Sequence, residues 1–197
     1  MVEIIEDCSP FYVRFTYPGI HKLIDLYSSS LPPMESLKNQ FSHLILPADK
    51  ARQILDLFPL AEHVSFTENR VSGFISKPGL YYRAHKDGTN HRFSVNFAVK
   101  VLDDKCITSW YSDQDLQEYS IDTLGGYSRE CINFDKSKHT AIKQMTVQQS
   151  ECILFNTDIF HDWDNRDSEN IRIMLTLRST DPGNVYFDDV KKLLYKI

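Results

Sequence analysis

Short apolar segments broken by turn residues dominate the middle of this 197-residue chain, and they restrict its fold more than any other feature. Between about residues 65 and 178, segments that resemble strands are separated by glycine, proline and aspartate, and no helical pattern follows each one. A parallel α/β sheet needs such helices, so the pattern predicts antiparallel strands in a sandwich or barrel. The expected strands cover residues 71–75, 80–84, 93–101, 108–111, 132–135, 152–156 and 171–177.

Helical periodicity is confined to the two flanks of this strand-rich region. Apolar residues at three- and four-residue spacing predict a helix that begins at Pro18, and a second that begins near Asp49 and ends before Pro59. A third short helix is expected at the end of the chain, with Ile197 on its apolar face. We expect one domain over 1–197, with N-terminal strands and supporting helices in 1–64, a β core in 65–180 and a C-terminal helix in 181–197.

Charge and composition exclude several classes of protein. The chain has 27 Asp+Glu against 22 Lys+Arg, and this net charge of −5 argues against binding to nucleic acid. No run approaches the roughly 18 apolar residues that span a membrane, and the first residues lack the basic start of a secretory signal. We therefore expect a cytoplasmic protein with no membrane partner and with reduced cysteines. The sequence gives no indication of the oligomeric state.

The residues that carry chemistry are two histidines and an aspartate. His85 and Asp87 are two residues apart, so on an extended strand both side chains point to the same face. His161 follows another expected strand, after which a loop can return it to the first pair. Two imidazoles and one carboxylate on one side of an ion leave its other side open, which is the arrangement of non-haem Fe(II) oxygenases. We predict that these three residues are the metal ligands and the catalytic residues.

The last expected strand adds an arginine to this set. Its residues alternate between an apolar face and a second face, Ile173, Leu175 and Leu177 against Arg172, Met174, Thr176 and Arg178. A guanidinium inside a barrel is costly unless it meets an anion. Arg172 lies eleven residues after His161, where its planar group can hold the distal carboxylate of a dicarboxylic co-substrate in two hydrogen bonds.

At these residues the sequence resembles the 2-oxoglutarate- and Fe(II)-dependent oxygenases, and among them the small prolyl-hydroxylase-like members of phage and marine-bacterial type. Their motif is H-x-D, a long gap, His, and then Arg or Lys roughly ten residues on. It stands here as His85-Lys86-Asp87, His161 and Arg172. The resemblance covers residues 71–178. The sequence departs from the family pattern at Met174, where some relatives have serine.

The resemblance implies a mainly β fold with flanking helices, namely a double-stranded β-helix, or cupin-like jelly roll. It implies Fe(II) held by His85, Asp87 and His161, and 2-oxoglutarate anchored by Arg172. Strand parity adds Tyr81 and Asn96 as candidate co-substrate contacts. The implied reaction uses O₂ to hydroxylate a C–H bond and releases succinate and CO₂, with ascorbate as a candidate cofactor. The substrate is a protein side chain, prolyl included, or a small molecule.

The presence of an acidic ligand, Asp87, points to hydroxylation, since halogenating relatives lack that ligand. Three alternatives stay open. A catalytically inactive jelly-roll binding module keeps the histidines without turnover, although it has no need of Arg172. A metal-dependent hydrolase uses the same ligands with Asp158 or Asp162 as general base. A nucleic-acid demethylase needs a basic groove, for which the modest candidates are Lys136, Lys138, His139 and Lys143.

The acidic segment 112–128 resembles a long insertion between strands. Long loops in such folds often cover the site, and its acidity favours a basic or neutral substrate.

Overall fold

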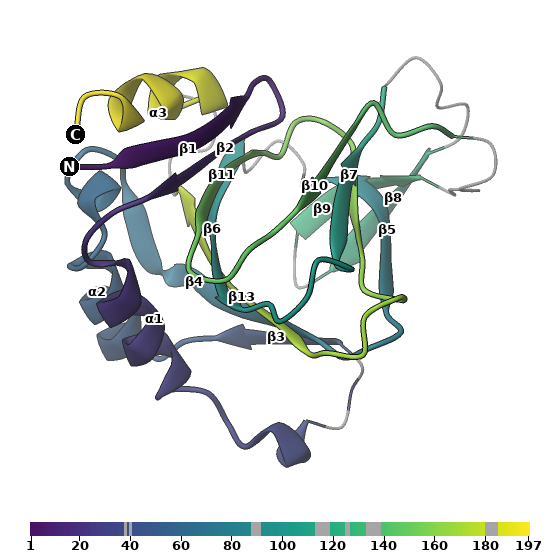
Figure 1. Cartoon of the computed structure of the whole chain (residues 1–197), viewed down its shortest axis with the longest axis horizontal. Helices are drawn as coiled ribbons and strands as arrows, with labels where there is room; N and C mark the ends of the chain where they lie inside the picture. Colours follow the sequence, from purple (N-terminus) through teal and green to yellow (C-terminus); the bar gives the residue numbers. More distant parts are fainter. Residues whose placement is uncertain are drawn as a thin grey trace.

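The computed structural model describes residues 1–37, 39, 41–87, 92–112, 139–179 and 185–197, and the backbone of 119–124 and 127–132. Within these residues the strands form two antiparallel sheets that face each other (Figure 1). The larger, the major sheet, has the order β1 (Glu3–Cys8), β2 (Tyr12–Thr16), β11 (Cys152–Asn156), β6 (Phe93–Lys100), β13 (Arg172–Ser179), β4 (Phe66–Ser76) and β3 (Phe41–Ile45). The minor sheet has the order β10 (Lys143–Thr146), β7 (Ile107–Trp110), β12 (His161–Asp164), β5 (Tyr81–Lys86), β9 (Tyr127–Ile132) and β8 (Tyr119–Leu124).

Two facing antiparallel sheets whose strands cross between layers are the architecture of a jelly roll. The prediction of a mainly β double-stranded β-helix with flanking helices is therefore confirmed.

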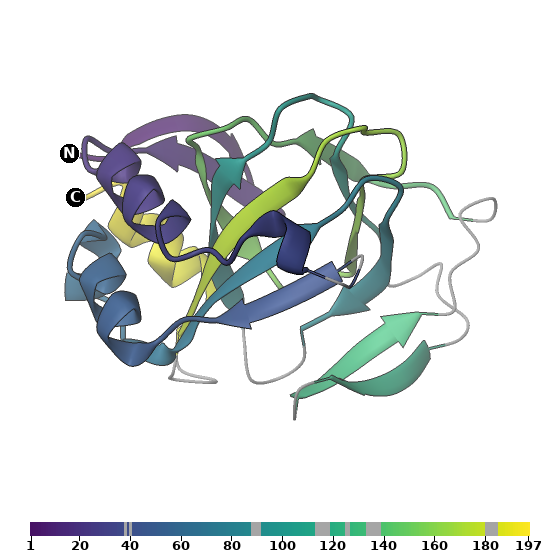
Figure 2. The ribbon, with the colours of Figure 1, turned by 90° about the horizontal axis from the view of Figure 1, so that it is seen from below.

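The helices cover the face of the major sheet that points away from the minor sheet (Figure 2). They are α1 (Ile20–Ser28), α2 (Ala48–Leu55) and α3 (Phe187–Leu194), with short 3₁₀ turns at Met34–Ser36 and Pro59–Glu62. Their buried apolar residues form one cluster with the outward-facing residues of β4, β6 and β13. In the part of the chain that is described, no helix has the length and apolar character needed to cross a bilayer.

The alternation predicted for the last strand is confirmed in β13. Ile173, Leu175 and Leu177 belong to the cluster under the helices. The other face of β13 points between the sheets, where Met174 joins a second apolar cluster with Trp110 and Phe155. The strand therefore separates the structural core from the inner space that the candidate site occupies.

Some expected boundaries are wrong. The strand expected at 132–135 is β9, which ends at Ile132, and residues 133–138 lie outside the described part. The segment 112–128 contains β8 and the first two residues of β9, which form a hairpin that pairs with β5 through β9, so it is not simply a loop. Its role over the site remains a prediction, since residues 113–118 and 125–126 also lie outside the described part.

Candidate metal centre and cofactor pocket

His85, Asp87 and His161 come together between the two sheets. His85 on β5 is paired with His161 on β12, and the two ring centroids are 4.5 Å apart. Asp87 lies just beyond the end of β5, with its Oδ1 3.5 Å from His85 Nε2. One ligand atom from each residue lies within 4.8 Å of the others, and all three side chains are buried. The three residues selected from the sequence therefore lie close enough together to hold a single metal ion.

Backbone carbonyls fix the orientation of both imidazoles. His85 Nδ1 lies 2.9 Å from the carbonyl oxygen of Arg83, and His161 Nδ1 lies 2.8 Å from that of Ile159. A carbonyl oxygen only accepts, so each Nδ1 carries the proton and donates it, and the unprotonated Nε2 is then the nitrogen that can bind a metal. Two such nitrogens and one carboxylate oxygen fit the donor set of Fe(II) with open positions.

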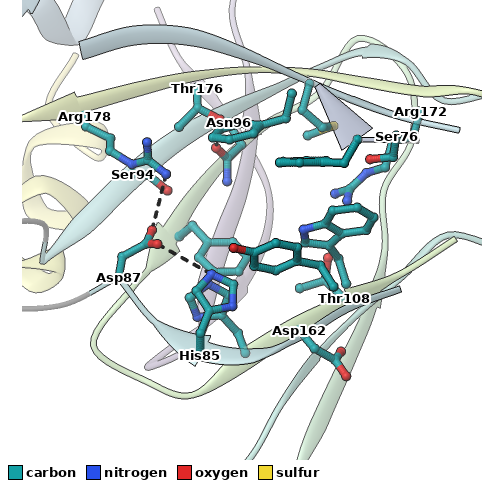
Figure 3. A pocket seen from close by; sticks show the side chains of 17 residues that line it. Ser76, His85, Asp87, Ser94, Asn96, Thr108, Asp162, Arg172, Thr176 and Arg178 are labelled. Carbon is teal, nitrogen blue, oxygen red and sulfur yellow. Dashed lines mark hydrogen bonds and ion pairs between the residues drawn. The ribbon is translucent and has the colours of Figure 1, made fainter. Parts of the chain in front are cut away.

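A cavity of about 90 Å³ lies beside these three residues (Figure 3). Its polar lining comes from strands of both sheets, namely Ser76, Ser94, Asn96, Thr108 and Thr176. Its aromatic lining consists of Phe41, Phe74, Tyr82, Phe155 and Trp163. Thr176 Oγ1 donates a 2.7 Å hydrogen bond to Asn96 Oδ1. Asn96 itself lines the cavity, as strand parity predicted.

Two arginines of β13 face this cavity from opposite sides (Figure 3). Arg172 is only 8% exposed, its guanidinium lies 5.6 Å from the centre of the Trp163 ring, and its Nε has no hydrogen-bond partner among the described residues. Arg178 lies on the metal-site side, with Nη2 3.5 Å from Asp87 Oδ2. The sequence placed Arg178 on the inner face but gave it no role, although the alternation that selected Arg172 selects both.

Tyr81 does not line the cavity, so the prediction from strand parity is wrong for this residue. On β12, Trp163 and His161 are two residues apart, yet their partners on β5, Tyr82 and His85, are three apart. This β-bulge shifts the alternation by one residue. Tyr82 therefore faces the cavity and contacts His85 edge-on, with centroids 4.9 Å apart. The Tyr81 phenol lies away from the cavity, where burial and the nearby charge of Asp162 raise its pKa.

His161 itself is the first residue of β12 rather than part of a loop. The four residues of β12, His-Asp-Trp-Asp, contain no apolar run that would reveal a strand. Only the pairing with β5 and β7 identifies it.

Other side chains hold the two aspartates that follow β11. Asp162 is fully buried, and its Oδ2 accepts a 2.7 Å hydrogen bond from the Tyr111 hydroxyl. Burial raises the pKa of Tyr111, and the charge of Asp162 raises that pKa further. Asp158 accepts two 3.2 Å hydrogen bonds from Arg92. A general base must be able to take a proton from metal-bound water, so these contacts weaken the hydrolase alternative. Of the basic cluster considered for nucleic acid, Lys136 and Lys138 lie outside the described residues.

Comparison with known proteins bears on the fold. No protein-family model matches the sequence, and no curated protein matches it either. Among solved structures, the epimerase SnoN, in complex with Fe³⁺, α-ketoglutarate and nogalamycin RO, superposes with a TM-score of 0.51 at 12% identity, over 90% of this chain and 84% of that one. HygX from Streptomyces hygroscopicus, with nickel and 2-oxoglutarate bound, gives 0.55 at 8% identity, over 89% and 84%. EvdO2 from Micromonospora carbonacea var. aurantiaca, complexed with 2-oxoglutarate, gives 0.55 at 12% identity, over 88% of each chain. At these identities the likeness establishes a shared fold.

Proposed function

We propose that this protein is an Fe(II)- and 2-oxoglutarate-dependent dioxygenase that hydroxylates a C–H bond, with release of succinate and CO₂. The observation that carries the proposal is the buried trio His85, Asp87 and His161, whose ligand atoms lie within 4.8 Å of one another beside a cavity. This donor set suits non-haem Fe(II) with positions left for a co-substrate and O₂. The metal and 2-oxoglutarate in SnoN and HygX support the choice of cofactors.

The protein's contribution is to hold the metal ligands and exclude water. The carbonyls of Arg83 and Ile159 hold both imidazoles with Nε2 toward the metal position. Arg178 balances the charge of Asp87 in a buried setting. Iron held there supplies the activation of O₂, coupled to oxidative decarboxylation of 2-oxoglutarate.

Arg172 anchors the distal carboxylate of 2-oxoglutarate in this proposal. It is a buried cation that faces the cavity, and an anion there would satisfy its guanidinium. Asn96 Oδ1 already accepts from Thr176, which leaves the amide N–H groups of Asn96 to donate to a carboxylate. Tyr81 is not part of the proposed pocket, because the bulge in β5 places Tyr82 rather than Tyr81 among the residues that line the cavity.

The substrate we favour is a small molecule rather than a peptidyl proline. Phe41, Tyr82 and Trp163 present aromatic surface around the cavity, which suits an apolar or ring-bearing compound. SnoN and HygX were each crystallised with a small molecule, nogalamycin RO and hygromycin B respectively. A peptide substrate predicts instead that +16 Da products appear on protein side chains.

An anaerobic titration with Fe(II) and then 2-oxoglutarate tests the proposal. We expect a weak visible charge-transfer band that is absent in His85→Ala and Asp87→Ala and unchanged in His21→Ala, a matched histidine on the exposed side of α1. On admission of O₂, the wild-type protein should form succinate. A folded wild-type protein without the band, or a band that survives Asp87→Ala, contradicts the proposal. A band without succinate favours the inactive binding module.

A further inference from the structure

A row of aromatic rings runs from His161 toward the edge of the major sheet. The Phe155 ring meets His161 edge-on, with centroids 4.7 Å apart, and the Trp110 ring lies 4.9 Å from Phe155. Trp110 is also the direct cross-strand partner of His161 in the pairing of β7 with β12. Tyr12 stacks on Trp110 at 5.1 Å and 25°. A candidate metal ligand is thus connected to Tyr12 by contacts of about 5 Å each.

The two oxidisable rings of this row differ in their polar surroundings. Trp110 is 0% exposed, and its Nε1 has no hydrogen-bond partner among the described residues. Tyr12 is almost as deeply buried, but its hydroxyl donates a 3.1 Å hydrogen bond to Glu6 Oε1. Glu6 is partly exposed and is held by Arg14 at 3.0 Å. Cys8, whose thiol is free and partly exposed, is the cross-strand partner of Tyr12 in the pairing of β1 with β2.

The lack of an acceptor at Trp110 in the described part of the chain and the carboxylate at Tyr12 suit stepwise electron transfer from Tyr12 through Trp110, with Glu6 at the partly exposed end of the row. Tryptophan and tyrosine are the side chains most readily oxidised by one electron, whereas phenylalanine is not and serves here only as packing between them. A tryptophan whose indole N–H has no acceptor keeps its proton when oxidised, so its radical stays strongly oxidising. A tyrosine loses its electron and its proton together, and therefore needs a base such as Glu6 in contact.

We propose that Trp110 and Tyr12 form an electron-transfer path that removes oxidising equivalents from the metal centre when O₂ reacts in the absence of substrate. The inference rests on the proposed function, which supplies the oxidant, a high-valent iron species. That species gains one electron from Trp110 and one proton from water, and the iron becomes ferric. Oxidised Trp110 then takes an electron from Tyr12, whose phenolic proton passes to Glu6.

The path is reset from solution. The partly exposed Cys8 thiol transfers a hydrogen atom to the buried Tyr12 radical, and a small thiol in solution then returns a hydrogen atom to Cys8. Glu6 returns its extra proton to water, so the net result is one small thiol oxidised by one electron for each equivalent removed. The pairing of β1 with β2 places Cys8 directly opposite Tyr12 for this transfer. A competing route exists in the cavity, where Tyr82 and Trp163 stack at 5.6 Å and 7°. The experiment must therefore distinguish the two pairs.

The test mixes the protein, loaded anaerobically with Fe(II) and 2-oxoglutarate, with O₂ and no substrate. Samples are frozen for electron paramagnetic resonance, and their tryptic peptides are analysed by mass spectrometry. The variants are Tyr12→Phe, Glu6→Gln and, as a matched control, Tyr27→Phe, which alters another buried tyrosine outside the row. Thermal unfolding of each variant serves as the control that it is folded.

We expect a tyrosyl radical in the wild-type protein and in Tyr27→Phe, with oxidation on the peptide that ends at Arg14. Tyr12→Phe should lose this radical, and oxidation of the Trp110 peptide should rise severalfold. Glu6→Gln should reduce the radical and shift oxidation to Trp110 in the same direction.

A tyrosyl signal that persists in Tyr12→Phe overturns the path, as does oxidation confined to Tyr82 and Trp163. Succinate measured in the same samples separates this result from failure of the proposed function. Succinate without oxidation of Tyr12 or Trp110 overturns the path alone, while the absence of both succinate and the metal band overturns both proposals.

Discussion

Arg178 lies against Asp87, with Nη2 3.5 Å from Oδ2, so the carboxylate that completes the candidate metal site already faces a buried cation. His85 Nε2 lies at the same distance from the other carboxylate oxygen. Both charged side chains are shielded from water, with 11% of Arg178 and 6% of Asp87 exposed. The Asp87 carboxylate of the candidate metal site therefore already has a counter-charge, which Arg178 supplies.

Replacement of Arg178 by methionine should destabilise the metal-free protein by about 3–5 kcal/mol, because it leaves the Asp87 carboxylate buried without its counter-charge. A bound divalent cation replaces that charge, so the loss should shrink when Ni²⁺ is present. Urea unfolding in EDTA and in Ni²⁺ measures both values. The matched control is Arg166→Met, because the Arg166 side chain is 49% exposed and its ion pair with Asp164 should contribute roughly 0–1 kcal/mol. Equal losses with and without Ni²⁺ would contradict the role of Arg178.

Replacement of Arg172 by alanine should weaken 2-oxoglutarate binding by about 2–5 kcal/mol, the range for truncating one partner of a buried charge pair. Metal binding should survive, since Arg172 lies on the far side of the cavity from Asp87. Calorimetric titration of the Ni²⁺-loaded protein with 2-oxoglutarate measures the effect. Arg52→Ala, a change on the exposed surface of α2, serves as the control. An unchanged affinity in Arg172→Ala would rule this residue out as the anchor.

Replacement of Gly73 by alanine should destabilise the protein by about 1–3 kcal/mol through overpacking. The added methyl group would collide with the hydroxyl of Tyr27, which packs from α1 onto β4. Tyr27→Phe should change stability little on its own, because the buried hydroxyl has no hydrogen-bond partner among the described residues. Combined with Gly73→Ala it should recover only part of the loss, since ring carbons also lie close. Denaturant unfolding of the four proteins measures this coupling, and strict additivity would contradict the collision.

Stability in acid should depend on Asp7. Partial burial raises the pKa of this carboxyl, but hydrogen bonds from Lys191, Ser9 and Tyr195 lower it more, so it lies well below its ordinary 3.8. A depressed native pKa gives stability that is present above the unfolded-state pKa and is lost as the pH falls below it. The wild-type protein should therefore lose stability below about pH 4 more steeply than Asp7→Asn. Urea midpoints measured across this range test the difference, and parallel profiles would contradict it.

Much of the site could be predicted because its signals are local in the sequence. The alternation from Arg172 to Arg178 depends only on the period of an extended strand, and β13 follows it. The pair His85 and Asp87 rests on the same two-residue spacing. The strand at 152–156 was also recognisable, because β11 is buried on both faces and forms a continuous apolar run.

The features that could not be predicted depend on pairing between distant segments. The bulge that turns Tyr82 into the cavity and Tyr81 out of it arises from the register of β5 against β12, some eighty residues later in the chain. The same pairing makes a strand of β12, which has little strand character of its own. The position of Trp110 beside His161 likewise follows from the neighbour order of the minor sheet, which no local pattern contains.

The extra residue in β5 lets one strand serve two purposes independently. The bulge changes the alternation of side chains between Tyr82 and His85. The stretch around Tyr82, which forms the wall of the cavity, and the stretch around His85, which presents the candidate ligands, are therefore each in register with β12 on their own side of the bulge. Side chains before the bulge can be exchanged without turning His85 away from its partners. Selection for a new substrate could therefore remodel the wall while the three candidate ligands stay aligned.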